Sequence, residues 1–278
     1  QSVVTTFILQ RFTDDPWLQE ALFCLFFTLF VVALMGNGLI IMAIYSSPNL
    51  HTPMYYFLVN LALLDVACIS TVLPKALQSL VAENTISFGG CLTQMFVFSW
   101  LLGSELLLFS AMAYDRYLAI CQPLHYGILM SSRVCVSLAS FVWSTGALNS
   151  LLLTCLTLPL PTFVSDVMTI ITDMFLTGLN FLLTMTSYSF IITSILRIQS
   201  AEGKQRAFST CSSHLVVVTL YYSTVLYTYI RPVLGSAGLL DKVAAILYTT
   251  VTPSLNPLIY TLRNKDFKAS VRKLVFPK

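Results

Sequence analysis

Long apolar stretches separated by short polar connections run through almost the whole 278-residue chain. A helix needs about 20 apolar residues to cross the ~30 Å hydrocarbon core of a bilayer, and each stretch reaches that length. Such a backbone finds no water in the bilayer core, so a helix is the structure that satisfies its polar groups. The pattern therefore predicts an all-α membrane protein, a seven-transmembrane helix bundle. The seven spans are placed at residues 21–45, 54–80, 90–120, 134–158, 166–197, 206–230 and 240–262.

The two ends of the chain have a different pattern. Residues 1–20 are too few to form a ligand-binding domain, so we expect a short outer N-terminus. Residues 264–275 alternate basic and apolar side chains, which is typical of a short amphipathic interfacial helix on the anionic inner leaflet. No internal repeat divides the spans, and residues 1–278 are expected to form a single seven-transmembrane domain.

Composition agrees with a bilayer location and adds an orientation. Apolar residues make up 56% of the chain and charged residues 10%, whereas soluble domains carry about 25% charged residues. With the N-terminus outside, eleven of the 15 lysines and arginines lie on the inner side, which is the usual bias of cytoplasmic loops. The net charge of +3 is therefore expected to face membrane lipid, and we expect no nucleic-acid partner.

Two carboxylic acids are expected at a similar depth in the membrane. Asp65 lies twelve residues, about 18 Å, from the inner start of its span at Pro53, and Glu105 lies ten residues, about 15 Å, above Asp115. Two acids in a medium of low dielectric constant share a proton, bind a cation such as sodium, or leave one of them neutral. An ion or proton site and a purely hydrogen-bonded pair both remain open. Asn256 in the last span can face the acids or satisfy backbone groups that the following proline frees.

Asp115 and Arg116 stand side by side at the inner end of the third span. Such a pair is costly in a membrane unless it faces water, a partner or a mobile helix, so we interpret it as an inner gate. Tyr188 lies about nine residues above the inner end of the fifth span, within reach of this gate. His214 lies in the hydroxyl-rich foot of the sixth span. We interpret His214 first as a structural histidine that forms hydrogen bonds. The alternative is a histidine that titrates and acts as a switch.

The outer half of the bundle has residues suited to a small-ligand cavity. On one face of the third span, large apolar side chains alternate with small and hydroxyl side chains, as they do in ligand pockets, although such a stripe is also typical of plain helix packing. Four residues of the sixth span share a face at spacing i, i+3, i+4 and i+7. The predicted ligand is small and mostly apolar. The predicted lining comprises Phe98, Ser99, Leu102, Gly103, Thr172, Leu176, Tyr222, Val225, Leu226, Tyr229 and Thr249.

Several motifs in the chain resemble those of vertebrate odorant receptors, a branch of the rhodopsin-like G-protein-coupled receptors. The most specific are Met112–Tyr117 and Phe208–Cys211, and the resemblance extends from Pro16 to Lys273. It implies a receptor rather than an enzyme, in the plasma membrane of olfactory neuron cilia, with a cytoplasmic C-terminus. Further motifs are Gly36-Asn37, Pro53–Leu58, Gln122–Tyr126, Ser187-Tyr188, Arg206–Leu215, Pro253–Tyr260 and Leu262–Asn264.

The resemblance also implies partners and residue roles. A small odorant would be the ligand, and Arg116 would engage a heterotrimeric stimulatory G protein of the olfactory type, which raises cyclic AMP. Asp65, Glu105 and Asn256 match the family's mid-membrane ion site, which implies a sodium ion or a shared proton and no further cofactor. The residues implied in activation and G-protein coupling are Asp115, Arg116, Tyr117, Tyr188, Arg206, His214 and Tyr260.

Cys91, at the outer start of the third span, matches a family cysteine that forms a disulfide with the second outer loop. In this chain that loop is expected to be little more than Thr162–Ser165, and it contains no cysteine. Roughly two dozen family residues are absent, so the expected disulfide of Cys91 has no partner in the chain. The N-terminal glycosylation sequon of the family is absent as well.

Other functions fit the residues less well. A rhodopsin-like receptor for another small ligand stays open, but an amine receptor needs an acid on the outer half of the third span and an opsin needs a lysine in the seventh, and both are missing. A transporter using Asp65 and Glu105 as an ion relay would favour paired repeats and half-helices. The zinc-protease and serine-hydrolase motifs do not occur, which speaks against an enzyme.

Overall fold

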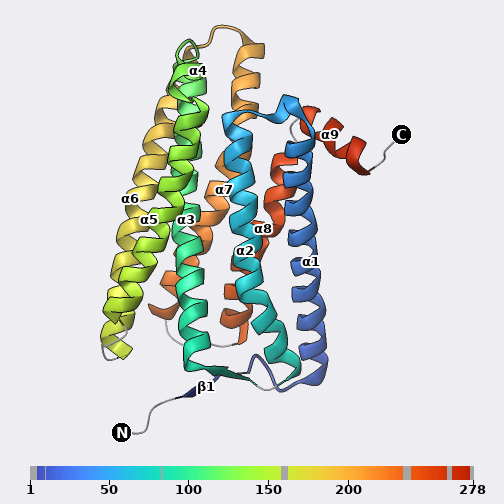
Figure 1. The fold of residues 1–278 in the computed structure, drawn as a ribbon, viewed down its shortest axis with the longest axis vertical. Helices are drawn as coiled ribbons and strands as arrows, with labels where there is room; N and C mark the ends of the chain where they lie inside the picture. Colours follow the sequence, from blue (N-terminus) through green and yellow to red (C-terminus); the bar gives the residue numbers. More distant parts are fainter. Residues whose placement is uncertain are drawn as a thin grey trace.

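The computed structural model describes residues 5–9, 11–82, 84–157, 162–233, 239–261 and 265–275, except for a number of side chains in the second half of the chain. Figure 1 shows a bundle of long helices that run along one common axis. In chain order the elements are β1 (Thr6–Ile8), α1 (Pro16–Ser46), the 3-10 helix η1 (Pro48–Leu50), α2 (Pro53–Val81), β2 (Thr85–Ser87), α3 (Phe88–Cys121), α4 (Tyr126–Leu129), α5 (Ser132–Thr157), α6 (Thr162–Arg197), α7 (Ala201–Val233), α8 (Leu239–Thr261) and α9 (Lys265–Val275).

Each predicted span corresponds to one long helix, namely α1, α2, α3, α5, α6, α7 and α8. The helices begin where local chemistry satisfies their first backbone N–H groups. The Asp15 side chain accepts a hydrogen bond from the Trp17 N–H at 3.0 Å before α1, and Ser87 accepts one from the Gly90 N–H at 3.1 Å before α3. Pro53 opens α2, where its missing N–H costs nothing.

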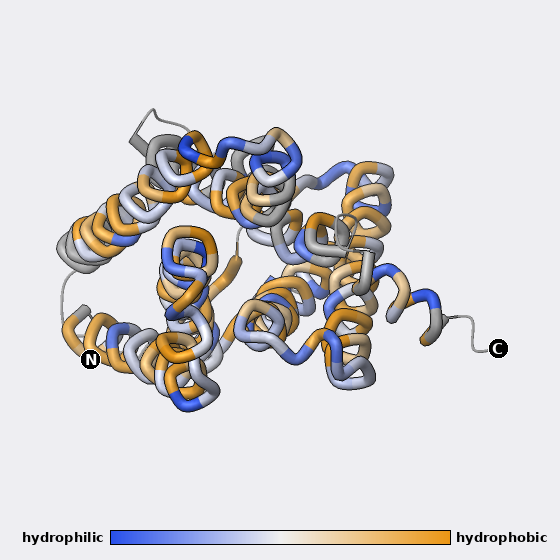
Figure 2. The backbone as a smooth tube through the Cα atoms, turned by 90° about the horizontal axis from the view of Figure 1, so that it is seen from above, coloured by the Kyte–Doolittle hydropathy of each residue, from blue (hydrophilic) through white to orange (hydrophobic). Residues whose placement is uncertain are grey.

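The third helix is the centre of the bundle, because α3 contacts α2, α5, α6 and α7. Its buried side chains belong to a large apolar cluster that joins α1, α2, α5 and α7, with Phe57, Leu108 and Phe109 fully buried in it. Seen from above in Figure 2, most helices carry orange, apolar stretches interrupted by shorter hydrophilic ones. A helix in this position can connect the outer half of the molecule to the inner face.

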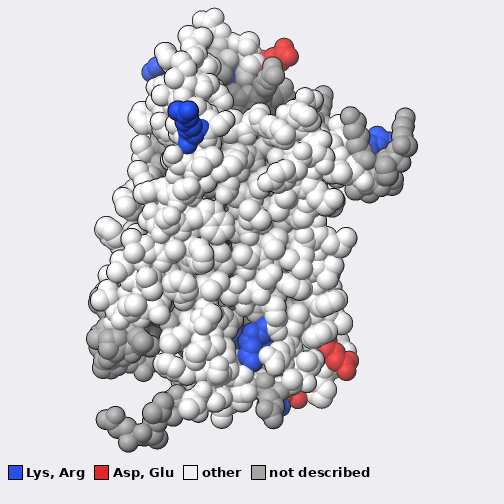
Figure 3. Space-filling model, viewed as in Figure 1, with Lys and Arg blue, Asp and Glu red and all other residues white. Residues whose placement is uncertain are grey.

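Five described helices are long and apolar enough to cross a membrane, and a shorter apolar stretch lies at His214–Ser223 in α7. The first turns of α7 carry charged and hydroxyl residues. Figure 3 shows the coloured charges near the two ends of the molecule, with an almost uncharged belt between them. The qualifying helices are Pro16–Ser46, Pro53–Val81, Phe88–Cys121, Ser132–Leu156 and Met174–Arg197.

The amphipathic segment near the C-terminus forms α9, which turns away from the bundle axis at the inner end (Figure 1). Phe267 is fully buried and stacks on Tyr55 with ring centroids 6.2 Å apart. Ser47 Oγ donates a hydrogen bond to Ser270 Oγ at 2.8 Å, while Lys268 stays exposed. This arrangement anchors the apolar face of α9 and leaves basic side chains outside.

Two features outside the spans were not expected from the sequence. Strands β1 and β2 pair antiparallel, with Phe7 opposite Ile86, and the short helix α4 forms in the inner loop after α3. Lys242 Nζ also donates a hydrogen bond to the Arg11 carbonyl at 3.1 Å, so the N-terminal segment is attached to both β2 and α8. Elements of three or four residues are too short to show a periodic pattern, which is why the sequence did not indicate them.

Candidate functional site: an inner gate, a buried acid pair and an outer apolar cluster

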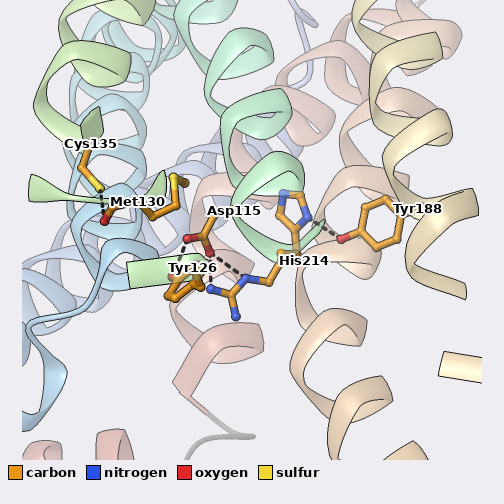
Figure 4. A network of polar contacts seen from close by, with 7 residues as sticks. Asp115, Tyr126, Met130, Cys135, Tyr188 and His214 are labelled. Carbon is orange, nitrogen blue, oxygen red and sulfur yellow. Dashed lines mark hydrogen bonds and ion pairs between the residues drawn. The ribbon is translucent and has the colours of Figure 1, made fainter. Parts of the chain in front are cut away.

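Asp115 and Arg116 are both buried at the inner end of α3, with relative exposures of 1% and 8%. Arg116 Nε donates a hydrogen bond to Asp115 Oδ2 at 2.8 Å, and Arg116 Nη2 donates to the same oxygen. Figure 4 marks the hydrogen bonds of Asp115 with dashed lines. A buried ion pair needs further hydrogen bonds to offset the loss of hydration. The surroundings of Asp115 supply one.

Tyr126 is the additional partner of Asp115, and sequence reasoning missed its role. Its hydroxyl donates a hydrogen bond to Asp115 Oδ1 at 2.7 Å (Figure 4). Burial raises the pKa of the Tyr126 phenol, and the nearby Asp115 carboxylate raises it further, so the group stays a hydrogen-bond donor. The short connection from α3 to α4 returns Tyr126 to the end of α3, and the Gln122–Tyr126 motif was the available signal.

We expect Tyr126→Phe to raise basal signalling about threefold to tenfold. The change removes only the hydroxyl, so Asp115 loses one hydrogen bond. A hydrogen bond to a charged group contributes ~1.5–3 kcal/mol. Part of this free energy stabilises the resting state over the active state, and its loss favours the active state. Basal cyclic AMP per molecule at the cell surface, the output that the resemblance implies, measures the effect. Tyr114→Phe, on an exposed side chain of α3 next to Asp115, is the matched control. Equal basal levels in the two variants would contradict a restraining role for Tyr126.

A second polar contact joins α6 to α7 beside the gate. The Tyr188 hydroxyl and His214 Nδ1 form a hydrogen bond, and both side chains are buried (Figure 4). Phe109 of α3 packs on the imidazole with centroids 6.1 Å apart. The structure therefore agrees with the hydrogen-bonded interpretation of His214. Tyr117 directly follows Arg116 on α3 and packs on Phe190. The side chains of Arg206 and Tyr260 lie outside the described part.

The predicted acid pair is present in the middle of the bundle. Asp65 and Glu105 are buried, with 1% and 5% exposure, and are close enough for their charges to interact. Asn256 Nδ2 donates a hydrogen bond to Asp65 Oδ2 at 2.8 Å. Asn37, which was predicted only as part of a family motif, donates to the Pro253 carbonyl at 3.0 Å and so links α1 to the same region of α8.

Four side-chain oxygens around the acid pair have no hydrogen-bond partner among the described residues. They belong to Asn37, Asp65, Glu105 and Asn256, and all are buried. Carboxylate and amide oxygens are the ligands of hard cations, so the donor set fits a small cation or a shared proton. Within the same described part, no group of three or more His, Cys, Asp or Glu side chains could hold a metal ion.

Four residues of the predicted ligand lining, on α3 and α7, belong to the main apolar cluster. Val225 is buried in this cluster, and Phe98, Leu102 and Tyr222 are partly buried against it. Tyr221, the residue before Tyr222, donates a hydrogen bond to the Leu102 carbonyl at 3.1 Å. The spacing of residues had placed the α3 positions on one helix face and the α7 positions on another. It did not show that these two faces meet.

The other residues of the predicted lining lie outside this cluster or outside the described part of the chain. A Cβ on Gly103 would meet the Gly146 Cα at 3.9 Å, so Gly103 faces α5 rather than α7. Ser99, Thr172 and Leu176 are half-buried on α3 and α6, and Thr249 on α8 donates to the Ala245 carbonyl at 2.7 Å. The side chains of Leu226 and Tyr229 lie outside the described part.

Cys91 is half-buried near the outer start of α3, and its thiol is free. The other six cysteines of the chain are free thiols as well. The expected disulfide of Cys91 therefore has no counterpart in this structure, as the absence of a loop cysteine implied.

The sequence profile described as 7 transmembrane receptor (rhodopsin family) matches residues 36–260. The matched region contains the buried acids, the α3 gate and the α3–α7 contact, so fold and site define a seven-transmembrane receptor of the rhodopsin family. Olfactory receptor 13A1 of Homo sapiens is 48% identical over 100% of this chain and 92% of its own length. Olfactory receptor 13G1 of Homo sapiens is 46% identical over 98% of this chain and 97% of its own length. Olfactory receptor 2B6 of Mus musculus is 41% identical over 99% of this chain and 96% of its own length. The chain belongs to the olfactory receptors of this family.

Family membership sets the coarse function. The protein is a receptor and not an enzyme, it is a multi-pass protein of the plasma membrane, and its partners are an odorant and a G protein. The family generally uses no cofactor.

The alignment with olfactory receptor 13A1 has 302 positions for the 278 residues of this chain, so 24 aligned positions have no residue here. This number agrees with the expected absence of roughly two dozen family residues.

Proposed function

We propose that this olfactory receptor binds a small, mostly apolar odorant in the outer half of the bundle and activates a stimulatory, olfactory-type G protein that raises cyclic AMP. The observation that carries the proposal is the arrangement of α3. This one helix carries Phe98 and Leu102 at the contact with α7, Glu105 in the acid pair, and Arg116 at the inner end. The N-terminus is outside and the C-terminus cytoplasmic, and olfactory neuron cilia are the proposed location.

The ligand chemistry follows from the side chains at the α3–α7 contact. Phe98, Leu102 and Val225 supply apolar surface, whereas the buried Tyr222 hydroxyl has no hydrogen-bond partner among the described residues. The Thr184 hydroxyl on α6 lies near it. A neutral odorant with one oxygen atom would fill the apolar part and accept or donate a single hydrogen bond.

Signalling then requires that the odorant binds the active arrangement more tightly than the resting one. In the resting arrangement Asp115 holds Arg116, and Tyr126 holds Asp115. Release of Arg116 would let it engage the G protein, with Tyr188 and His214 rearranging between α6 and α7. Linkage requires that the G protein in turn tightens odorant binding.

A panel of neutral volatiles applied to cells that express the receptor and a cyclic AMP reporter tests the proposal. We expect responses to a small set of oxygenated odorants, and no response in cells without the stimulatory G protein. Odorant responses that persist without that G protein would reject the proposed coupling. A parallel binding measurement on purified receptor separates a failure to bind from a failure to couple.

The acid pair predicts a cation or proton effect on basal activity. We expect Asp65→Asn to abolish the dependence of basal cyclic AMP on sodium and on pH, because the change keeps the size of the side chain but removes its charge. The expected change in sodium response is from severalfold to less than twofold, measured in membranes at constant ionic strength. Asn60→Asp on the same helix, at a position bonded to Trp143, controls for a general effect of polar change in α2. An unchanged sodium response in Asp65→Asn would leave the acids with a structural role.

A further inference from the structure

A pair of serine hydroxyl groups joins the inner end of α1 to the middle of α9. Ser47 Oγ donates a hydrogen bond to Ser270 Oγ at 2.8 Å, and both side chains are half-buried. Ser47 is also the residue that caps α1, because its backbone N–H donates to the Ile44 carbonyl. None of the residues of the odorant contact, the acid pair or the gate belongs to this serine contact.

Helix α9 is attached to the bundle by one apolar face. Phe267 is fully buried on that face, and Val271 and Leu274 are partly buried against the main apolar cluster. The helix has only 11 residues, and a helix of this length is marginal in water without such packing. Local opening of a short terminal helix costs less free energy than unfolding of the whole bundle. Ser270 can therefore become accessible while the seven long helices stay folded.

Basic residues stand on both sides of Ser270 in the sequence. Lys268 and Arg272 lie two positions before and two positions after it, and both side chains are exposed. Kinases that act on serines between basic residues bind their substrates in an acidic groove, so charge complementarity favours this segment as a substrate. In the proposed orientation the C-terminus is cytoplasmic, which is the side of the membrane where ATP and such kinases are found.

We propose that a serine kinase selective for basic segments phosphorylates Ser270, and that the phosphate detaches α9 from α1. In this reaction Ser270 Oγ attacks the γ-phosphorus of ATP, the bond from that phosphorus to the bridging oxygen breaks, and ADP leaves. A base of the kinase takes up the hydroxyl proton. At pH 7 the product carries about 1.5 to 2 negative charges at the contact with Ser47.

The docked position of α9 does not accommodate this phosphate. The 2.8 Å between the hydroxyl oxygens of Ser47 and Ser270 is a hydrogen-bond distance, which leaves no room for a further group between them. The phosphate would also face the C-terminal end of α1, where the last carbonyl groups of the helix carry partial negative charge. Repulsion at a helix C-terminus is one of the ways in which phosphorylation disrupts a contact.

The inner ends of α1 and α2 supply no lysine or arginine to offset the new charge, since neither residue type occurs in the sequence from position 12 to position 74. On α9 itself, Lys268 and Arg272 are two positions away from Ser270, and residues at that spacing do not share a helix face. The imidazole of His51 is already 3.0 Å from a carbonyl oxygen at the end of α1. The phosphorylated chain therefore favours the detached position of α9.

Kinase treatment of the full chain in nanodiscs tests both parts of the proposal. The receptor is incubated with ATP and the catalytic domain of protein kinase C, in discs of phosphatidylcholine alone so that no anionic lipid holds a detached α9. Mass spectrometry measures phosphate on the peptide that contains Ser270 and the hydrogen exchange of the α9 amides. We expect phosphate at Ser270 and about tenfold faster exchange in the phosphorylated peptide, because opening of α9 exposes these amides. Neither odorant nor G protein is present, so the result is independent of the proposed signalling.

Substitutions at neighbouring positions of α9 are the controls. Ser270→Asp without kinase is expected to accelerate exchange about fivefold, since it places a smaller negative charge at the same contact. Ala269→Asp adds the same charge on an exposed side chain of α9 and is expected to stay within about twofold of the unchanged chain. Ser270→Ala treated with kinase is expected to keep slow exchange, which excludes an effect of other phosphorylated residues. Melting temperatures show that all variants are folded.

Three results would overturn the proposal. The first is a lack of phosphate at Ser270 under conditions in which the kinase phosphorylates a standard substrate protein. The second is phosphate at Ser270 with unchanged exchange of the α9 amides. The third is equal acceleration by Ser270→Asp and Ala269→Asp, which would assign the effect to the loss of basic charge on α9 and not to its contact with α1.

Discussion

Replacing Arg116 by alanine is expected to lower odorant-stimulated cyclic AMP about 100-fold or more while odorant binding changes less than about tenfold. The coupling free energy between two sites of a receptor is typically ~1–3 kcal/mol. Loss of the G-protein contact can therefore weaken odorant binding by that amount at most. Arg116 lies far along α3 from Phe98, and within the described part of the chain it donates its side-chain hydrogen bonds to Asp115. The variant therefore separates binding from signalling.

Two measurements on the same preparations check this expectation, namely cyclic AMP in cells and odorant binding to purified receptor. Arg133→Ala is the matched control, because Arg133 is an exposed arginine at the inner start of α5. It should retain signalling within about twofold. Full signalling by Arg116→Ala would contradict the role of the α3 gate, and loss of binding together with signalling would point to misfolding instead.

Replacing Gly146 by leucine is expected to destabilise the folded receptor by about 3 kcal/mol or more, the upper end of the usual cost of overpacking a core. A Cβ at this position would meet the Ser104 N and the Trp100 O at 3.0 Å, and the Ser104 Oγ even closer. These atoms belong to the close contact between α3 and α5, where Trp100 Nε1 also donates to the Trp143 carbonyl at 3.0 Å. Backbone atoms cannot move aside without separating the two helices.

The thermal midpoint in detergent and the amount of receptor at the cell surface both report this loss. Gly178→Leu is the control, since its Cβ meets open space on α6, and it should match the unchanged receptor in both measurements. A Gly146→Leu receptor with an unchanged midpoint would contradict the tight approach of α3 and α5. Gly146→Ala is expected to have a smaller effect in the same direction.

The sequence predicted the spans and the gate pair well because both depend on local patterns. Apolar length alone identifies a membrane helix, and adjacent residues such as Asp115 and Arg116 are certain to lie close together. The acid pair needed a depth calculation along two helices, which worked because each helix rises by a fixed 1.5 Å per residue. The meeting of Asp65 with Asn256 was one of two alternatives that the sequence left open, because Asn256 could also have satisfied backbone groups freed by the following proline.

Other features could not be predicted because they depend on contacts between distant segments. Tyr126 reaches Asp115 only because the chain reverses within a few residues after α3, and the strand pairing of β1 with β2 joins residues about 80 positions apart. Gly103 faces α5 because of the way α3 is rotated about its own axis. Packing of α3 against α5 sets this rotation. A spacing rule shows which residues share a face but not which neighbour that face meets.

The length of α3 gives it the properties of a lever. Eighteen residues separate Phe98 from Arg116, which corresponds to ~27 Å along a straight helix. A tilt of about 5° around the level of Phe98 would thus move Arg116 by ~2.4 Å. The hydrogen bond from Tyr126 to Asp115 tolerates a change of only a few tenths of an ångström before it weakens. Under the proposed function, a ligand that tilts α3 by a few degrees would therefore move the inner end far enough to weaken this hydrogen bond.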